Sequence, residues 1–180
     1  MVKILVIVDT QEDFIYGPLG TPEAQAIVPN VNKKIKEYES NGGAIIFTRD
    51  THHEDYLKTN EGRHLPIQHC IFNTSGWEIA SDIHRPVPHY SIIDKNTFGY
   101  GLWNHNRIIS NAYTLGEECN IEIIGLCTDI CVVSNALILK ATYPEANITV
   151  DASCCAGTTP ERHKAALEVM KSCQINVIGE

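Results

Sequence analysis

The sequence has no run of basic residues and no apolar run long enough to cross a bilayer. Its 180 residues include 14 Lys and Arg against 22 Asp and Glu, a formal net charge of −8. Nucleic-acid binding depends on a basic surface, so this balance argues against a nucleic-acid partner. The apolar run at residues 4–8 is far shorter than the roughly 20 residues of a transmembrane helix, and no small-residue cleavage site follows it. We expect no membrane partner either.

A regular cysteine pattern is also missing. The seven cysteines are odd in number and have no repeating spacing, which fits a reducing compartment better than a disulfide framework. We therefore expect a cytoplasmic protein. The chain contains no C-x-x-C motif, which argues against a thiol redox protein.

Internal repeats, low-complexity tracts and linkers are absent as well, so we predict one domain over residues 1–180. Apolar runs without alternation are typical of parallel strands that are covered on both faces. Strands are predicted at 4–8, 44–47, 121–124 and 148–150, with weaker candidates at 90–93 and 175–178. Helices are predicted at 29–40, 104–118, 131–141 and 160–172. This alternation predicts an α/β fold, a doubly wound, mostly parallel sheet in three α/β/α layers.

Ligands of such sheets bind beyond the carboxyl ends of the strands. Asp9 follows the first predicted strand, Asp50 and His52 follow the second, and Lys95 follows the run that ends at Ile93. The segment from Gly125 onward follows the next strand and carries Cys127 and Cys131. We expect these residues to converge on one edge of the sheet.

Cys131 is the candidate nucleophile, because it follows a strand and a short turn at a predicted helix N-terminus. A helix N-terminus stabilises a thiolate, and its free N–H groups stabilise an oxyanion. Asp9 is placed to take the thiol proton and Lys95 to hold the charged partners. Each residue also has an ordinary alternative: a buried inert cysteine, a turn-capping or metal-binding aspartate, and a solvated lysine.

Three motifs resemble those of the isochorismatase-like cysteine hydrolases, in the same order and with similar separations. The opening motif D-x-Q-x-D-F is present as Asp9-Thr-Gln-Glu-Asp-Phe14, and K-x-x-F as Lys95-Asn-Thr-Phe98. The nucleophile turn G-x-x-T-D-x-C-V is present as Gly125-Leu-Cys-Thr-Asp-Ile-Cys-Val132. The resemblance covers essentially the whole chain.

This resemblance implies the isochorismatase-like hydrolase fold and assigns the catalytic roles. Cys131 is then the nucleophile, Asp9 the general base and Lys95 the orienting cation. It further implies a cis peptide between Leu126 and Cys127, with an oxyanion hole made by the N–H groups of Cys127 and Cys131. The implied reaction attacks an amide carbonyl, releases ammonia or an amine, and hydrolyses a thioester.

A metal site is also indicated. Asp50 and His52 occupy alternate positions of an extended segment, so both side chains leave on one face, and His69 is a candidate third ligand. Carboxylate and imidazole sets suit zinc, iron or manganese, and zinc is our first expectation. The alternative is that these histidines only cap turns or lie on the surface.

The nicotinamidase branch of the same family carries D-x-H and P-x-H-C segments that supply metal ligands. Asp50 and His52 match the first segment, and His69 matches the second with one extra residue after Pro66. A further ligand lies between the two segments in that branch. Glu61 is the candidate here, ahead of His53, Asp55 and His64.

The predicted substrate pocket departs from that branch in one respect. Many nicotinamidases have a tryptophan before P-x-H-C, whereas this chain has Leu65. We expect Phe14, Leu126 and Tyr100 to line the pocket, and Tyr100 or Trp103 to close it; a pocket shaped for another ring or acyl group is the alternative. Trp77 is interpreted as a packing residue, Asp13 as a solvated one, and Gln11 is left open.

The leading hypothesis is therefore a metal-assisted amidohydrolase of the nicotinamidase type, which converts nicotinamide to nicotinate and ammonia and so serves NAD salvage. The second is a related cysteine hydrolase that acts on another amide, carbamoyl or ureido compound. The third is a non-catalytic binding module with an ordinary Cys131. The resemblance also implies a homo-oligomer, a dimer or tetramer, and a small-molecule amide as partner.

Overall fold

Strand β1 (Val2–Val8) runs through the middle of a six-stranded sheet, and its residues 4–8 are fully buried. A run of consecutive buried positions requires cover on both faces of the sheet. The computed structural model describes residues 2–114 and 118–180, and within them all strand pairs are parallel. The prediction of a doubly wound parallel sheet is therefore confirmed.

The spatial order of the strands is β3-β2-β1-β4-β5-β6. The chain moves outward from β1 through β2 (Ala44–Asp50) to β3 (Ser91–Lys95). It then crosses back to β4 (Cys119–Leu126) and moves the other way through β5 (Asn147–Ala156) to β6 (Asn176–Ile178). The direction of winding reverses between β1 and β4, which is where ligands bind in doubly wound folds. Asp9 and the nucleophile turn follow these two strands.

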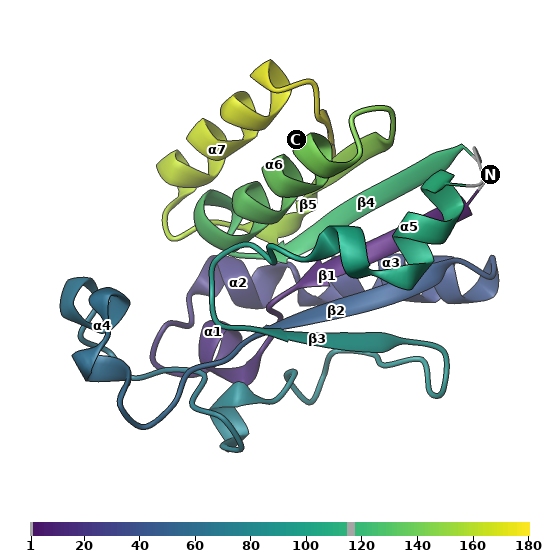
Figure 1. Ribbon diagram of the computed structural model, residues 1–180. Coiled ribbons are helices and arrows are strands. Elements are labelled where there is room, and N and C mark those ends of the chain that lie inside the picture. Colours follow the sequence, from purple (N-terminus) through teal and green to yellow (C-terminus); the bar gives the residue numbers. More distant parts are fainter. Residues whose placement is uncertain (1, 115–117) are drawn as a thin grey trace.

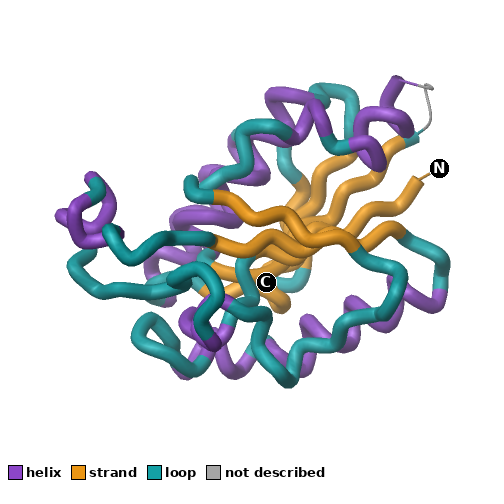
Figure 2. The backbone as a smooth tube through the Cα atoms, turned by 60° about the horizontal axis from the view of Figure 1, so that its bottom comes forward, coloured by secondary structure: helices purple, strands orange, loops and turns teal. Residues whose placement is uncertain are grey.

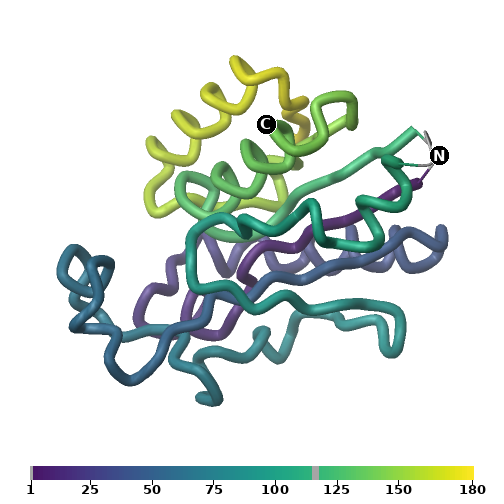
Figure 3. The backbone as a smooth tube through the Cα atoms, in the orientation of Figure 1, coloured from purple at the N-terminus to yellow at the C-terminus, as the bar shows by residue number. Residues whose placement is uncertain are grey.

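Helices cover both faces of the sheet (Figure 1). One face carries α1 (Glu12–Ile15), α2 (Pro22–Ala26) and α3 (Val28–Ser40), of which α3 contacts β1, β2 and β5. The other face carries α5 (Arg107–Thr114), α6 (Val133–Thr142) and α7 (Pro160–Ser172). Right-handed crossovers require this division, because the two halves of the chain wind in opposite directions. Figure 3 shows those halves in purple to blue and in green to yellow.

Local signals in the sequence account for several helix ends. Helix α7 begins after Thr159, whose side chain accepts a hydrogen bond from the Arg162 N–H, and Pro160 occupies the first turn. Helix α3 ends before Gly42, which has a φ of 69°.

The boundaries of most predicted elements differ from the structure: β1, β2 and β4, for example, are longer than the predicted strands at 4–8, 44–47 and 121–124. Strand β5 extends to Ala156, beyond the predicted 148–150, because after an irregularity near Gly125 it pairs with β4 again. The predicted helix 104–118 is the short turn η3 (Trp103–His105) followed by α5, and 115–117 lie outside the described residues. The predicted helix 131–141 begins as a π-helical turn, η4 (Thr128–Val132). The weak strand at 90–93 is β3, which reaches Lys95.

The connection from β2 to β3 contains only short helical segments: η1 (Tyr56–Lys58), α4 (Asn60–His64) and η2 (Ser75–Trp77). Figure 2 shows that α4 stands away from the sheet and from the helical layers. This connection carries all the predicted metal ligands beyond Asp50. No helix among the described residues has the length and apolarity needed to cross a membrane.

Gly125 allows β1 and β4 to approach each other beside the site. Its φ is 117°, and a Cβ at this position would lie 2.1 Å from the Val8 carbonyl oxygen. Both the backbone conformation and the space therefore require glycine.

We expect Gly125→Ala to lower the free energy of unfolding by about 2–4 kcal/mol, because the new methyl group clashes with backbone and the φ is strained. Gly101→Ala is the matched control, since a Cβ there meets nothing within 4 Å. Urea denaturation of both variants measures the difference. Equal stability of the two variants would contradict the close approach of β1 and β4.

Candidate active site

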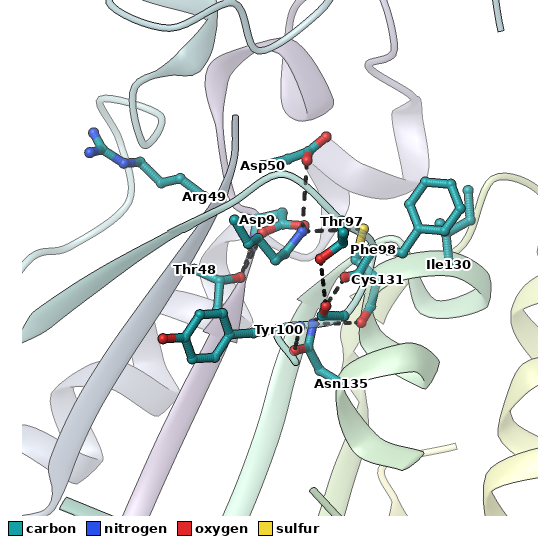
Figure 4. Close-up of polar contacts among 12 residues, drawn as sticks. Asp9, Thr48, Arg49, Asp50, Thr97, Phe98, Tyr100, Ile130, Cys131 and Asn135 are labelled. Carbon is teal, nitrogen blue, oxygen red and sulfur yellow. Dashed lines mark hydrogen bonds and ion pairs between the residues drawn. The ribbon is translucent and has the colours of Figure 1, made fainter. Parts of the chain in front are cut away.

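Three buried side chains from three strand ends meet at the switch point. The Lys95 Nζ lies 2.6 Å from Asp9 Oδ2 and 3.7 Å from Cys131 Sγ. Figure 4 shows Asp9 and Cys131 together with the neighbouring residues Thr48 and Asn135. Lys95 is the last residue of β3, Asp9 follows β1, and Cys131 lies in the turn after β4. All three residues are at most 4% exposed. The structure thus brings the three predicted catalytic residues together.

Asp9 is held in place by Thr48 on the neighbouring strand β2. Its Oδ1 accepts a hydrogen bond of 2.6 Å from Thr48 Oγ1, and its N–H donates to the Thr48 carbonyl oxygen at 3.2 Å. Asp9 also has a φ of 47°, an uncommon conformation for a residue other than glycine. These contacts turn the carboxylate out of the strand toward Lys95.

Burial and charge set the protonation states. Burial raises the pKa of the Asp9 carboxyl, against the opposing effect of Lys95. Burial alone would lower the pKa of Lys95, but the Asp9 carboxylate and its neighbours raise it, so the amine stays charged. Burial raises the pKa of the Cys131 thiol, and the charge of Asp9 raises it further.

Burial therefore works against the expected thiolate at a helix N-terminus, although the charge of Lys95 lowers the pKa of the thiol. Cys131 lies within the π-helical turn η4 rather than in the first turn of an α-helix. Burial and the adjacent carboxylate together favour the neutral thiol. An acceptor for the thiol proton is accordingly needed, and Asp9 is the carboxylate that Lys95 holds beside it.

The nucleophile turn, residues 125–132, is held by hydrogen bonds to α7 and to the residues just before it. The peptide bond between Leu126 and Cys127 is cis, as expected. Thr128 Oγ1 hydrogen-bonds to His163 Nδ1 on α7 at 2.8 Å. Asp129 accepts two hydrogen bonds from Thr158, from its N–H at 2.8 Å and from its hydroxyl at 2.6 Å.

Asn135, one helical turn after the nucleophile, supports the turn from below. Its Nδ2 donates to the Cys131 carbonyl oxygen at 2.8 Å, and its Oδ1 accepts from the Tyr100 N–H and the Trp103 indole. It is fully buried. Asn135 is not among the residues predicted from the sequence, although its spacing of four from Cys131 places it on the same side of a helix.

A second cluster of side chains lies beside the three catalytic candidates. One ligand atom from each of its four members lies within 4.8 Å of every other; the members are Asp50, His52, Glu61 and His69. These are the four residues predicted as metal ligands. The cluster adjoins the lysine, since Lys95 Nζ is 3.9 Å from Asp50 Oδ1.

The donor atoms of this cluster suit a divalent metal. His52 Nε2 is buried and lies 3.0 Å from Asp50 Oδ2. His69 Nδ1 contacts the Ile67 carbonyl oxygen at 2.8 Å, which turns its Nε2 into the cluster. Burial would raise the pKa of the Asp50 carboxyl, but hydrogen bonds from His52 and His69 hold that pKa well below its usual range. Two imidazoles and two carboxylates are a donor set that zinc accepts.

The alternatives to Glu61 lie elsewhere. His53 stacks against Phe72, with ring centroids 6.0 Å apart, and His64 Nδ1 contacts the Asn60 carbonyl oxygen at 2.8 Å. Neither they nor Asp55 is part of the cluster that the described residues form. Glu61 lies on α4, the segment that stands away from the sheet, and its side chain is 24% exposed.

Gln11 and Asp13 position the metal-ligand segments. Gln11 is fully buried: its side chain accepts from the Asp50 N–H at 2.6 Å and donates to the carbonyl oxygens of Asp50 and Trp77, both at 2.8 Å. Asp13 Oδ2 accepts from the Cys70 N–H at 2.8 Å, next to His69. The interpretation of Asp13 as solvated is therefore wrong. Both residues belong to the D-x-Q-x-D-F motif, and this motif is the sequence signal that could have indicated their role.

Trp77 packs as predicted. Its side chain is 6% exposed, its indole N–H donates to Thr51 Oγ1 at 2.8 Å, and the Arg49 guanidinium lies 3.5 Å from the ring centroid. These contacts attach the β2–β3 connection to the end of β2.

A cavity of about 550 Å³ joins the thiol to the metal cluster. Its walls include Cys131 and Cys127 together with Phe14 and Leu126, two of the predicted substrate contacts. Among the described residues, Tyr100 and Trp103 do not line this cavity. They contact each other edge to face, with ring centroids 5.2 Å apart, and Trp103 is fully buried. In place of Tyr100 and Trp103, the cavity wall contains Leu19, Leu65 and Ile130 together with one aromatic side chain, Phe98.

Comparisons with known proteins agree with this geometry. A sequence model described as the isochorismatase domain matches residues 3–179. The isochorismatase family protein PncA of Bacillus subtilis (strain 168) is 25% identical over 146 residues, which are 76% of this chain and 78% of that protein.

Solved structures resemble the fold over its whole length. The pyrazinamidase of Pyrococcus horikoshii, solved in complex with zinc, has a TM-score of 0.82 and 27% identity, with 100% of both chains covered. The nicotinamidase/pyrazinamidase PncA of Bacillus subtilis has a TM-score of 0.82 and 24% identity, with 99% of this chain and 100% of that chain covered. Since the family match spans nearly the whole chain, this protein belongs to the isochorismatase family.

Proposed function

We propose that this protein is a metal-assisted cysteine amidohydrolase of the nicotinamidase type, which converts nicotinamide and water to nicotinate and ammonia. The observation that carries the proposal is a cavity that Cys131 shares with Asp50, Glu61 and His69. Lys95 Nζ lies 3.7 Å from the sulfur of Cys131 and pairs with Asp9. The likeness to a pyrazinamidase solved with zinc supports the same reading. In this role the enzyme acts in NAD salvage.

The first half of the reaction forms a thioester. Asp9 takes the proton from the Cys131 thiol as the sulfur attacks the amide carbon. Lys95 keeps its charge beside both groups, and so offsets the negative charge that passes from the carboxylate to the thiolate. The C–N bond then breaks, and the leaving nitrogen takes the proton from Asp9 to depart as ammonia.

The second half hydrolyses the thioester. A water molecule loses its proton to Asp9 and adds to the acyl carbon, and the thiol of Cys131 is regenerated as the acid leaves. In both halves negative charge develops on the carbonyl oxygen. The N–H groups of Cys127 and Cys131, at the turn fixed by the cis peptide and by Asn135, are our proposed oxyanion hole.

The proposed metal is zinc, with iron or manganese as alternatives. Its proposed ligands are Asp50, His52, Glu61 and His69. A bound metal at this place would act as a Lewis acid that holds the ring nitrogen of the substrate. The apolar wall of Phe14, Leu65 and Leu126 would pack against the ring. Cytoplasmic location and homo-oligomeric assembly remain predictions from the sequence.

Cys131→Ala is expected to reduce ammonia release from nicotinamide by at least about 10⁴-fold, because it removes the thiol that Lys95 contacts and that forms the thioester. The melting temperature and circular dichroism should stay close to those of the parent protein. Cys173→Ala is the matched control, since Cys173 lies at the end of α7, outside the cavity lining, and should keep full activity. Full activity of Cys131→Ala would refute the assigned nucleophile.

Removal of metal by a chelator is expected to abolish nicotinamide hydrolysis, and added Zn²⁺ to restore it with about one ion per chain. Elemental analysis and titration calorimetry measure the stoichiometry and affinity. His69→Ala should lower Zn²⁺ affinity by about 100-fold or more, since a buried ligand is lost. His64→Ala should leave the affinity unchanged, because His64 lies outside the cluster.

If the protein contains no metal after treatment with a chelator and still keeps full activity, the metal-assisted mechanism is refuted. That outcome would favour the second hypothesis, a related hydrolase of another amide, carbamoyl or ureido compound.

A further inference from the structure

The two N–H groups of the proposed oxyanion hole lie at opposite ends of one short segment, from Cys127 to Cys131. The Cys127 carbonyl oxygen accepts hydrogen bonds from the N–H groups of Ile130 and Val132, both at 3.1 Å. These two donors are the residues on either side of Cys131, so the bonds hold the nucleophile close to Cys127. The orientation of this segment in the cavity therefore depends on the contacts that hold it from outside.

His163 on α7 holds the middle of this segment through Thr128. Thr128 is fully buried, and its hydroxyl oxygen lies 2.8 Å from His163 Nδ1. Among the described residues, His163 is the only hydrogen-bond partner of that hydroxyl. In the described part of the chain, His163 itself does not line the cavity. Any effect of this ring on the reaction is therefore exerted through Thr128.

Helix α7 packs closely against the turn at this point. A Cβ at Gly157 would lie 2.9 Å from His163 Cα and 2.9 Å from Asp129 Oδ1. Glycine at this position therefore lets the helix approach the turn without a side chain between them. Asp129, the residue after Thr128, accepts two hydrogen bonds from Thr158. Two consecutive side chains of the turn are thus attached to residues 157–163.

The imidazole of His163 is neutral near pH 7. Burial lowers the pKa of this ring, against the opposing charges of Asp129 and Glu180. A neutral imidazole has one nitrogen that donates a hydrogen bond and one that accepts it, and a threonine hydroxyl does both. The contact between Nδ1 and Thr128 therefore forms with either tautomer of the ring. What it requires is a polar atom at the position of Nδ1.

We propose that His163 is a positioning residue for the reaction: through Thr128 it holds the Cys127 N–H where the oxyanion forms. This inference rests on the proposed function, because it uses the proposed nucleophile and oxyanion hole. The Cys127 N–H lies one residue before Thr128, so a shift of Thr128 moves this donor relative to the substrate. Donors aimed at a developing oxyanion act mainly on the transition state. The loss of the contact therefore lowers kcat rather than raising KM.

His163→Leu is expected to lower kcat for nicotinamide about tenfold and to keep KM within about twofold of the parent value. His163→Asn should restore kcat to within about threefold of the parent, because its amide reaches the position of Nδ1. His163→Gln places its amide nearer the position of Nε2 and should resemble His163→Leu. Lys164→Gln, which changes an exposed neighbour on α7, is the matched control and should keep the parent kcat. A higher KM with an unchanged kcat in His163→Leu would contradict the proposal.

Thr128→Val removes the other half of the contact and should lower kcat by a similar factor. The double variant Thr128→Val/His163→Leu should lose no more kcat than either single variant, because both changes break the same contact. If the two losses multiply, the residues act independently and the proposal is overturned. Urea denaturation shows whether each variant is folded. If Thr128→Val does not fold, the series at the half-buried His163 decides alone.

Hydrogen exchange of the peptide 125–132 gives a readout that needs no substrate. We expect faster exchange in His163→Leu than in the parent protein and in Lys164→Gln, and exchange close to that of the parent in His163→Asn. Full kcat for nicotinamide in His163→Leu overturns the role of His163 and leaves the proposed function standing. A parent protein that hydrolyses no amide overturns the proposed function. Hydrogen exchange then decides the role of His163, which an unchanged rate in His163→Leu overturns.

Discussion

The buried contact of Lys95 with Asp9 and Cys131 is the interaction on which the rest of the structure depends. A lysine that is only 4% exposed retains its charge because a carboxylate lies 2.6 Å away. The same carboxylate stays near its partner because Thr48 holds its other oxygen. A buried charge without its partner costs several kcal/mol, so removing any one of these groups disturbs the others. Burial and the charge of Asp9 raise the pKa of the Cys131 thiol, which favours its neutral form.

The parallel sheet makes this contact possible. Strands β3, β1 and β4 are separated along the sequence, yet their carboxyl ends lie on one edge of the sheet. The reversal of winding between β1 and β4 leaves an open crevice there, because the crossover helices leave toward opposite faces. Gly125 brings the backbones of the two strands together beside that crevice. The fold therefore fixes where these residues lie, and the side chains after each strand supply the polar groups of the site.

Much of the site could be predicted from the sequence because it follows from strand ends and motifs. Asp9, Lys95 and Cys131 each lie at or just after the end of a strand, and Asp50 and His52 alternate on an extended segment. What could not be predicted depends on the path of the β2–β3 connection. That path brings His69 and Glu61 to the cluster from a region without regular strands, and sequence spacing does not fix such a path.

The differences from the sequence predictions have physical causes as well. The thiolate expectation considered the helix N-terminus but not the desolvation of a fully buried sulfur. Tyr100 was expected in the pocket because it is aromatic and close to the motif, whereas Asn135 draws its backbone N–H toward α6. Thr48 carries no signal of its own, since its importance arises from pairing beside Val8 in the sheet.

The three hydrogen bonds of Gln11 have a consequence for how such a site can diversify. By tying its own segment to the backbone of Asp50 and Trp77, this one side chain joins the segment after β1 and the end of β2 into a single rigid frame. Replacements of exposed residues in the β2–β3 connection, apart from Glu61, can then reshape the mouth of the cavity while Asp9 and Asp50 keep their spacing.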